Sequence, residues 1–88
     1  MDLLLYTTSA CHLCEQAEAL LAPVLAYVNS NRAKPIVLCK REITESAELV
    51  ERYGIRIPVI RFRDSAQELG WPFDQAEAFA FIGAQAEN

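Results

Sequence analysis

The chain has 88 residues, 52% of them hydrophobic, and a formal net charge of −4. This length allows one hydrophobic core and the composition argues against disorder, so we expect residues 1–88 to form a single domain. The negative charge argues against nucleic acid or an anionic membrane as the main partner.

No segment predicts a membrane anchor or a secretory signal. The longest apolar stretch, around residues 17–28, is too short to span a bilayer and contains Pro23. The first residues lack a basic region and a long apolar region. We therefore expect a cytoplasmic protein, and in that reducing compartment a close cysteine pair is more often catalytic or metal-binding than a permanent crosslink.

The first third of the chain predicts a strand followed by a helix. Residues 2–6 form a strand candidate whose residues from Leu3 to Tyr6 are continuously apolar, which is typical of a central strand covered on both faces. After a polar loop, apolar residues recur from Cys11 onward at helical spacing until residues 29–31 end the helix. Pro23 should kink or locally break this helix, but we expect a single helix. Its predicted apolar face comprises Leu13, Ala17, Leu20, Leu21, Val24 and Val28.

A second strand and a short helix are predicted in the middle of the chain. Residues 35–41 are β-prone, Thr44 is a plausible N-cap for the helix, and Gly54 follows its end. All eight Lys and Arg residues lie between positions 32 and 63, and four glutamates interrupt them. We interpret most of these charges as paired and solvated, with a local anion site near Arg56 as the alternative.

The last third predicts a hairpin and a final helix. Residues 58–63 form a strand candidate, and residues 67–69 return as a short edge strand. Asp74 and Glu77 have the spacing of a capping box that opens a helix. The predicted fold class is therefore α/β with the order β-α-β-α-β-β-α, in which a four-stranded mixed sheet has helices on both faces. The first β-α-β unit should be a right-handed parallel crossover.

Cys11 and Cys14 carry the clearest chemical signal. At positions i and i+3 of a helix their Cβ atoms lie about 5–6 Å apart on one face, and a slight tightening of the turn would bring them to the roughly 3.8 Å of a disulfide. Cys11 lies at the helix start, where unpaired N–H groups and the helix dipole stabilise a thiolate. Cys14 should be less exposed and less ionised. We therefore predict that Cys11 attacks a disulfide and that Cys14 resolves the mixed disulfide.

Two neighbouring side chains receive simpler interpretations. His12 is interpreted as a neutral, half-exposed residue that adjusts the reduction potential, because a positive imidazole is disfavoured at a helix N-terminus. Cys39, on the second predicted strand, is interpreted as a small buried apolar residue rather than a third redox partner.

These motifs together resemble the thioredoxin fold. A strand, then Cys-x-x-Cys opening a helix, then Ile57-Pro58 entering a later strand form the pattern, and segments 6–15, 49–58 and 71–74 are similar to small bacterial glutaredoxin-like proteins. The resemblance covers nearly the whole chain. It implies a cis peptide bond between Ile57 and Pro58 beside the cysteine pair. It also implies that the backbone of Ile57 pairs with an extended substrate such as glutathione or a client peptide.

The chain departs from the glutaredoxin pattern where glutathione would be recognised. The common Cys-Pro-Tyr-Cys is replaced by Cys-His-Leu-Cys, and no basic residue precedes Cys11. The usual Thr-Val-Pro is Arg56-Ile57-Pro58, so Arg56 adds a positive charge for a substrate carboxylate. Where glutaredoxins have a Gly-Gly turn before the last helix, this chain has Gly70-Trp71-Pro72, and Pro72 lacks the N–H that could have held the glutamyl group of glutathione. Asp74 has two interpretations: it only caps the last helix, or it binds the glutamyl amine of glutathione as well.

The sequence thus favours a monomeric thiol–disulfide oxidoreductase that needs no bound cofactor or metal. Its expected partner is glutathione or a protein disulfide client, and glutathione is a candidate reductant. One alternative is a metal-binding module, for which only Cys39 and His12 could join the cysteine pair unless two chains share a zinc ion or an iron–sulfur cluster. A second alternative is a binding adaptor of the same fold, with Trp71, Pro72 and Phe73 as its anchor.

Overall fold

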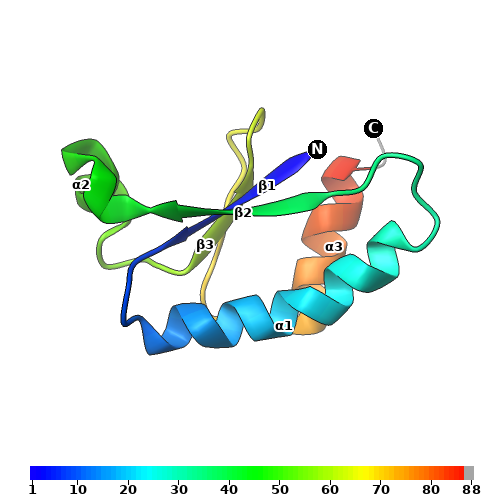
Figure 1. Cartoon of the computed structure of the whole chain (residues 1–88), viewed down its shortest axis with the longest axis horizontal. Helices are drawn as coiled ribbons and strands as arrows, with labels where there is room; N and C mark the ends of the chain where they lie inside the picture. Colours follow the sequence, from blue (N-terminus) through cyan, green and yellow to red (C-terminus); the bar gives the residue numbers. More distant parts are fainter. Residues whose placement is uncertain (87–88) are drawn as a thin grey trace.

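The computed structural model describes residues 1–86 and confirms the predicted order of elements (Figure 1). Among these residues, no helix is long and apolar enough to cross a membrane. The elements are β1 (Asp2–Thr7), α1 (His12–Asn29), β2 (Val37–Glu42), the 3-10 turn η1 (Ile43–Glu45), α2 (Ala47–Tyr53), β3 (Val59–Phe62), β4 (Leu69–Gly70) and α3 (Gln75–Ala86).

The strands form one mixed sheet with the order β2-β1-β3-β4. The strands β1 and β2 are parallel, whereas β3 runs antiparallel to both β1 and β4, so the predicted crossover pairing and final hairpin are confirmed. Four consecutive residues of β1, from Leu3 to Tyr6, are 0–3% exposed. This burial explains the continuous apolar run, because a central strand is covered on both faces.

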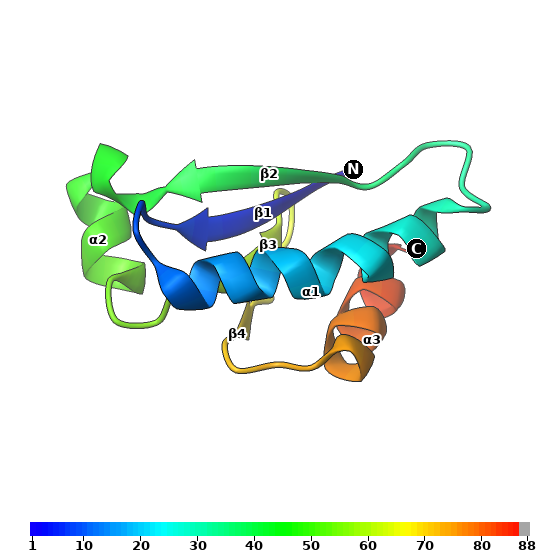
Figure 2. The same ribbon diagram turned by 60° about the horizontal axis from the view of Figure 1, so that its bottom comes forward.

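Helices pack against both faces of the sheet, with α1 and α3 on one side and the α2 segment on the other. Figure 2 shows α1 and α3 on the same side of the strands and α2 beyond the ends of β1 and β2. The larger core, between the sheet and the pair α1 and α3, is built around Leu3, Leu5, Leu21, Ile60 and Ile82, which are all 0% exposed. The smaller core consists of Leu4, Tyr6, Ile43, Tyr53 and Val59. Burying each large aliphatic side chain contributes about 1.5–3 kcal/mol, so the sheet holds the elements that carry the cysteines firmly.

The helix α1 runs without interruption through Pro23, as predicted, but its buried face is rotated from the predicted one. Its buried residues are Cys14, Ala17, Leu21, Val24 and Leu25. Leu13 was expected on this face and is 45% exposed. Consecutive side chains lie about 100° apart around a helix, so turning Cys14 toward the protein turns Leu13 toward solvent.

Two other predicted details are wrong, and one is confirmed. The N-cap of α2 is Ser46, whose hydroxyl accepts the Leu49 N–H at 3.4 Å, whereas Thr44 lies in η1 because Glu42 caps that turn first. The edge strand lies at 69–70 rather than 67–69. The capping box of α3 is present: the Asp74 N–H donates to Glu77 Oε1 at 3.2 Å, and the Glu77 N–H donates to Asp74 Oδ1 at 2.8 Å.

Candidate active site

The two cysteines lie where the β1–α1 loop becomes a helix. Cys11 is the N-cap of α1, with extended backbone angles (φ −93°, ψ 105°), and its sulfur accepts the Cys14 N–H at 3.2 Å. The two Cα atoms are 5.2 Å apart and the sulfur atoms are bonded as a disulfide. The sulfur of Cys11 thus occupies the capping position where a helix N-terminus stabilises negative charge.

The two cysteines differ in their exposure to solvent, as predicted from the sequence. Cys14 is 3% exposed and packs into the protein, whereas Cys11 is only half-buried. A disulfide partner approaching from solvent therefore reaches Cys11 first. Cys14 lies behind it, one helical turn along, in a position to attack the Cys11 sulfur.

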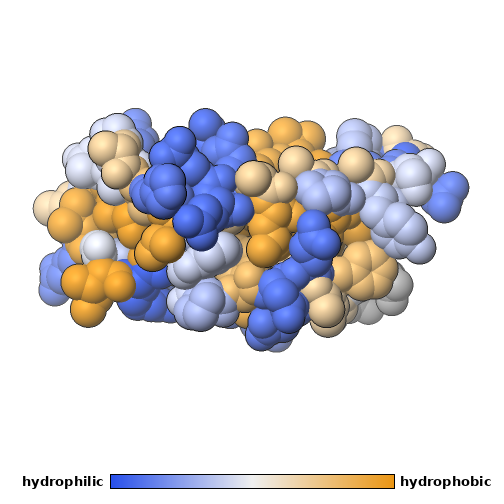
Figure 3. Space-filling model, turned by 90° about the horizontal axis from the view of Figure 1, so that it is seen from below, coloured by the Kyte–Doolittle hydropathy of each residue, from blue (hydrophilic) through white to orange (hydrophobic). Residues whose placement is uncertain are grey.

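A cleft of about 500 Å³ opens beside the pair and is unusually rich in carboxylates. Both cysteines line it, together with the loop from Thr7 to Ala10. Its charged residues are Glu15 and Glu18 of α1, Lys40 and Glu42 of β2, and Glu45 of η1. On the face of the molecule seen in Figure 3, hydrophilic side chains gather over the N-terminal half of α1.

Glu42 connects this cleft to the loop before Cys11. Its carboxylate accepts the Ser9 N–H at 2.9 Å and the Thr44 N–H at 3.3 Å. A hydrogen bond from the Thr8 side chain is the largest of several interactions that hold the pKa of Glu42 below its ordinary value. The next loop residue, Ala10, has a φ of 60°, in the left-handed region that residues other than glycine seldom adopt. Glu42 therefore anchors a loop whose end sets the position of Cys11.

We expect Glu42→Ala to loosen this loop. Removing the acceptor leaves the Ser9 N–H without its partner, so hydrogen exchange at that amide should accelerate by about fivefold or more, the factor that corresponds to a net hydrogen-bond contribution of about 1 kcal/mol. NMR-detected exchange measures this rate. The matched control is Glu45→Ala, which removes a nearby exposed carboxylate and should leave the Ser9 amide unchanged. Equal rates in all three proteins would show that Glu42 does not hold the loop.

The structure confirms the cis peptide bond between Ile57 and Pro58 and contains a second one between Trp71 and Pro72, which the sequence analysis did not anticipate. The Ile57 N–H donates to the Tyr53 carbonyl at 3.1 Å, and the Pro58 carbonyl accepts the Trp71 N–H at 3.0 Å. Neither Ile57 nor Pro58 lines the cleft described above. Backbone pairing between Ile57 and a substrate stays a prediction, and it would use the Ile57 carbonyl because the N–H already has a partner.

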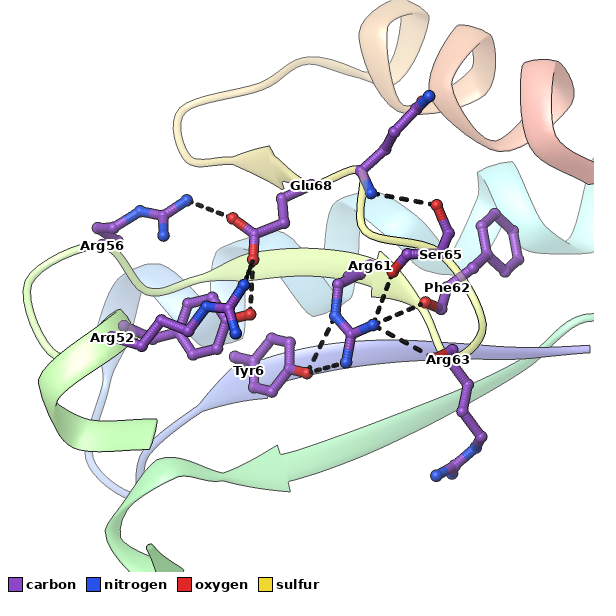
Figure 4. A network of polar contacts seen from close by, with 10 residues as sticks. Tyr6, Arg52, Arg56, Arg61, Phe62, Arg63, Ser65 and Glu68 are labelled. Atoms are coloured by element: carbon purple, nitrogen blue, oxygen red, sulfur yellow. Dashed lines mark hydrogen bonds and ion pairs between the residues drawn. The ribbon is translucent and has the colours of Figure 1, made fainter. Parts of the chain in front are cut away.

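Arg56, the predicted carboxylate-binding residue, already has a carboxylate partner within the chain. Its Nη2 lies 2.6 Å from Glu68 Oε1, and the Tyr53 hydroxyl donates to Glu68 Oε2 at 2.5 Å (Figure 4). Arg52 also approaches Glu68, at 3.9 Å. Burial alone would raise the pKa of Glu68, but the hydrogen bonds from Tyr53 and Arg56 and the two arginine charges outweigh it and lower that pKa. Arg56 thus closes an internal network.

The same network continues to β1 and β3. The Tyr53 ring stacks on Tyr6 with ring centroids 4.1 Å apart, and Arg61 donates to the Tyr6 hydroxyl at 2.8 Å. Burial is the largest of the causes that raise the pKa of Tyr53 to about 12, followed by the hydrogen bond to Glu68. This cluster was not predicted from the sequence, because its members have no common spacing: Tyr6, Tyr53, Arg61 and Glu68.

The remaining predicted residues have structural partners. Asp74 caps α3, and its binding of a glutamyl amine stays a prediction. His12 was predicted to be half-exposed, but its side chain is 86% exposed because it points away from the buried face of α1, with Nδ1 4.0 Å from Glu15. Cys39 was predicted to be buried but is only half-buried, because it lies on the edge strand β2, where it packs against the smaller core on the opposite side of the sheet from α1. Within residues 1–86, no group of three or more His, Cys, Asp and Glu side chains is arranged to hold a metal ion.

Comparison with known proteins agrees with this fold. The family model described as "Glutaredoxin-like domain (DUF836)" matches residues 2–83. The X-ray structure of target protein XcR50 from X. campestris is 36% identical, with a TM-score of 0.72, and the match covers 93% of this chain and 96% of that one. The solution structure of XcR50 is 38% identical, with a TM-score of 0.69 and coverages of 96% and 95%.

A more distant neighbour supports the fold alone. The first thioredoxin domain of mouse protein disulfide-isomerase A4 has a TM-score of 0.61 at 20% identity, with 94% of this chain and 61% of that chain covered. A search of curated proteins found no match.

Proposed function

Because this chain belongs to the glutaredoxin-like (DUF836) family and has a thioredoxin fold, we propose that it is a thiol–disulfide oxidoreductase that uses Cys11 and Cys14. One observation carries the proposal. The pair begins α1 at disulfide distance, with a half-buried sulfur that caps the helix and a buried sulfur behind it. This arrangement supplies both an accessible nucleophile and a resolving group.

The reaction starts from the reduced pair. The Cys11 thiolate attacks one sulfur of a client disulfide, which forms a Cys11–client mixed disulfide and releases the other client sulfur as a thiolate that takes up a proton. Cys14 then loses its proton and attacks the Cys11 sulfur, which forms the Cys11–Cys14 disulfide and releases the second client thiol. Two electrons and two protons pass to the client, and an external thiol reductant restores the pair.

The start of α1 stabilises the thiolate form of Cys11, which is the nucleophile. The Cys14 N–H that donates to Cys11 Sγ at 3.2 Å would stabilise a thiolate there, and the partial positive charge of the helix terminus acts in the same direction. Lowering a thiol pKa by about two units needs about 2.7 kcal/mol, and a terminus supplies up to ~2 kcal/mol in partly buried geometry. The hydrogen bond from the Cys14 N–H acts in the same direction.

The proposed partners are glutathione or a protein disulfide, in a reducing cytoplasm, with the chain acting as a monomer and without a bound cofactor. Cys39 is not needed, because it packs on the opposite side of the sheet from α1.

A redox titration tests the proposal. Equilibration with glutathione buffers, followed by mass spectrometry, should show the reversible loss of two hydrogen atoms per chain with a midpoint of roughly −200 to −270 mV, the range of glutaredoxins and thioredoxin. Iodoacetamide should modify Cys11 of the reduced protein near neutral pH. A Cys39→Ser control should give the same midpoint. If reduced Cys11 resists alkylation near neutral pH, the proposed mechanism is wrong.

A further inference from the structure

The carboxylates of the cleft beside Cys11 bear on which disulfides can approach it. The cleft presents Glu15, Glu18, Glu42 and Glu45, against the single cation Lys40. The disulfide in its wall makes this a substrate-facing surface under the proposed function, so the carboxylates act on whatever reaches the sulfur.

The structure separates engaged carboxylates from available ones. Glu42 is held by loop hydrogen bonds, and Glu18 faces Lys40 Nζ at 3.4 Å. By contrast, the Glu15 side chain is 75% exposed and Glu45 is exposed. The cleft therefore keeps net negative charge after its internal pairing, and the available carboxylates stand on the elements α1 and η1 that border it.

Lys40 of the cleft and Arg56, the two cations considered for binding an anionic substrate, already have carboxylate partners. Lys40 is paired inside the cleft, and Arg56 is paired with Glu68. His12 lies beside Glu15 and adds positive charge only when protonated. Glutathione and its disulfide carry more carboxylates than ammonium groups, so they are net anions near neutral pH. The field of this cleft repels them and attracts cations.

We infer that this site selects disulfides flanked by Lys or Arg, in a basic peptide or protein segment, over anionic disulfides such as that of glutathione. The inference rests on the proposed function and names its substrate class. The chemistry is the exchange described above, with the basic segment as the client that accepts two electrons. The carboxylates do not react: they raise the concentration of cationic clients at Cys11 and stabilise the mixed disulfide.

Two peptides of identical length test the inference, each with a single cysteine and each used as its disulfide-linked dimer. One peptide has Lys on both sides of the cysteine, and the other has Glu. Reduction by the fully reduced protein is followed under single-turnover conditions at about pH 8, where an ordinary histidine is neutral. At low ionic strength we expect the basic peptide to react about tenfold or more faster than the acidic one, within the range of electrostatic steering. The difference should shrink toward unity at about 1 M salt, where the screening length is about 3 Å.

Substitutions assign the preference to the cleft. The double variant Glu15→Gln, Glu45→Gln should reduce the basic-to-acidic rate ratio at least about threefold, whereas Lys40→Gln should increase it. Glu51→Gln is the matched control, because Glu51 is exposed on α2 and lies outside the cleft. Circular dichroism and the redox midpoint of each variant show that the fold and the cysteine pair are intact.

The outcomes separate the inference from the proposed function. If neither peptide is reduced, the oxidoreductase proposal itself is wrong. If both peptides are reduced at equal rates, or the acidic one faster, the protein is an oxidoreductase but the substrate inference is overturned. A preference that survives unchanged in the double variant also overturns it, because the charge would then lie outside this cleft.

Discussion

Replacing Cys11 with serine (Cys11→Ser) should reduce disulfide turnover to the uncatalysed rate, a loss of about 10³-fold or more. The half-buried Cys11 sulfur caps α1 and is the group that a client can reach, whereas Cys14 is 3% exposed. A serine hydroxyl can still accept the Cys14 N–H as a cap, so the helix should persist while the nucleophile is lost. Initial rates of peptide disulfide reduction measure the effect, and circular dichroism checks the fold.

The partner substitution Cys14→Ser should have a different signature. Attack by Cys11 remains, but no thiol lies behind it to break the mixed disulfide, so the reaction should stop at a Cys11–client adduct. Non-reducing mass spectrometry should detect one client per chain, and a thiol reductant should release it. Cys39→Ser should retain turnover and accumulate no adduct. Continued turnover by Cys11→Ser would assign the nucleophile elsewhere and contradict the mechanism.

Local sequence signals predicted most of the frame that holds these cysteines. The apolar run of β1, the helical period of α1 and the capping box at Asp74 and Glu77 depend on neighbours in the chain, and all three are confirmed. Errors arose where the decisive contact is less local. Glu42 reaches back to the Ser9 amide and forward to Thr44, which displaces the start of α2 to Ser46.

The surroundings of the cysteine pair were harder to predict than the pair itself. Cys-x-x-Cys at a helix start is a local pattern, and the geometry follows from helical spacing. The acidic cleft needs β2 and η1 to approach α1, and its glutamates look like ordinary solvated charges in sequence. Likewise, Arg56 was expected to bind a substrate carboxylate. Only the folded chain shows that its guanidinium donates to the carboxylate of Glu68, 12 residues later.

A large loss of stability is expected on replacing Tyr53, the residue that packs α2 against the sheet. Tyr53 is 1% exposed, stacks on Tyr6 and donates to Glu68, so Tyr53→Ala should lower the free energy of unfolding by about 3–5 kcal/mol. Tyr53→Phe keeps the ring but removes the hydroxyl from Glu68, with an expected loss of about 1–3 kcal/mol. Urea denaturation followed by Trp71 fluorescence measures both. Tyr27→Phe, at a residue that is 69% exposed, is the control and should change stability by less than about 0.5 kcal/mol.

The pH dependence of these variants tests whether the folded protein holds the Tyr53 hydroxyl in its protonated form. Burial, then the Glu68 hydrogen bond, raises the pKa of Tyr53 to about 12, against an unfolded value of about 10. A raised pKa means that the folded state holds the phenol proton more tightly, so the associated stability is complete below about pH 10 and is lost as pH rises toward about 12. The advantage of the wild type over Tyr53→Phe should therefore be constant near neutral pH and shrink across that window. A constant difference up to about pH 12 would mean that folding does not raise the pKa of this hydroxyl, and it would contradict the combined effect of burial and the Glu68 hydrogen bond.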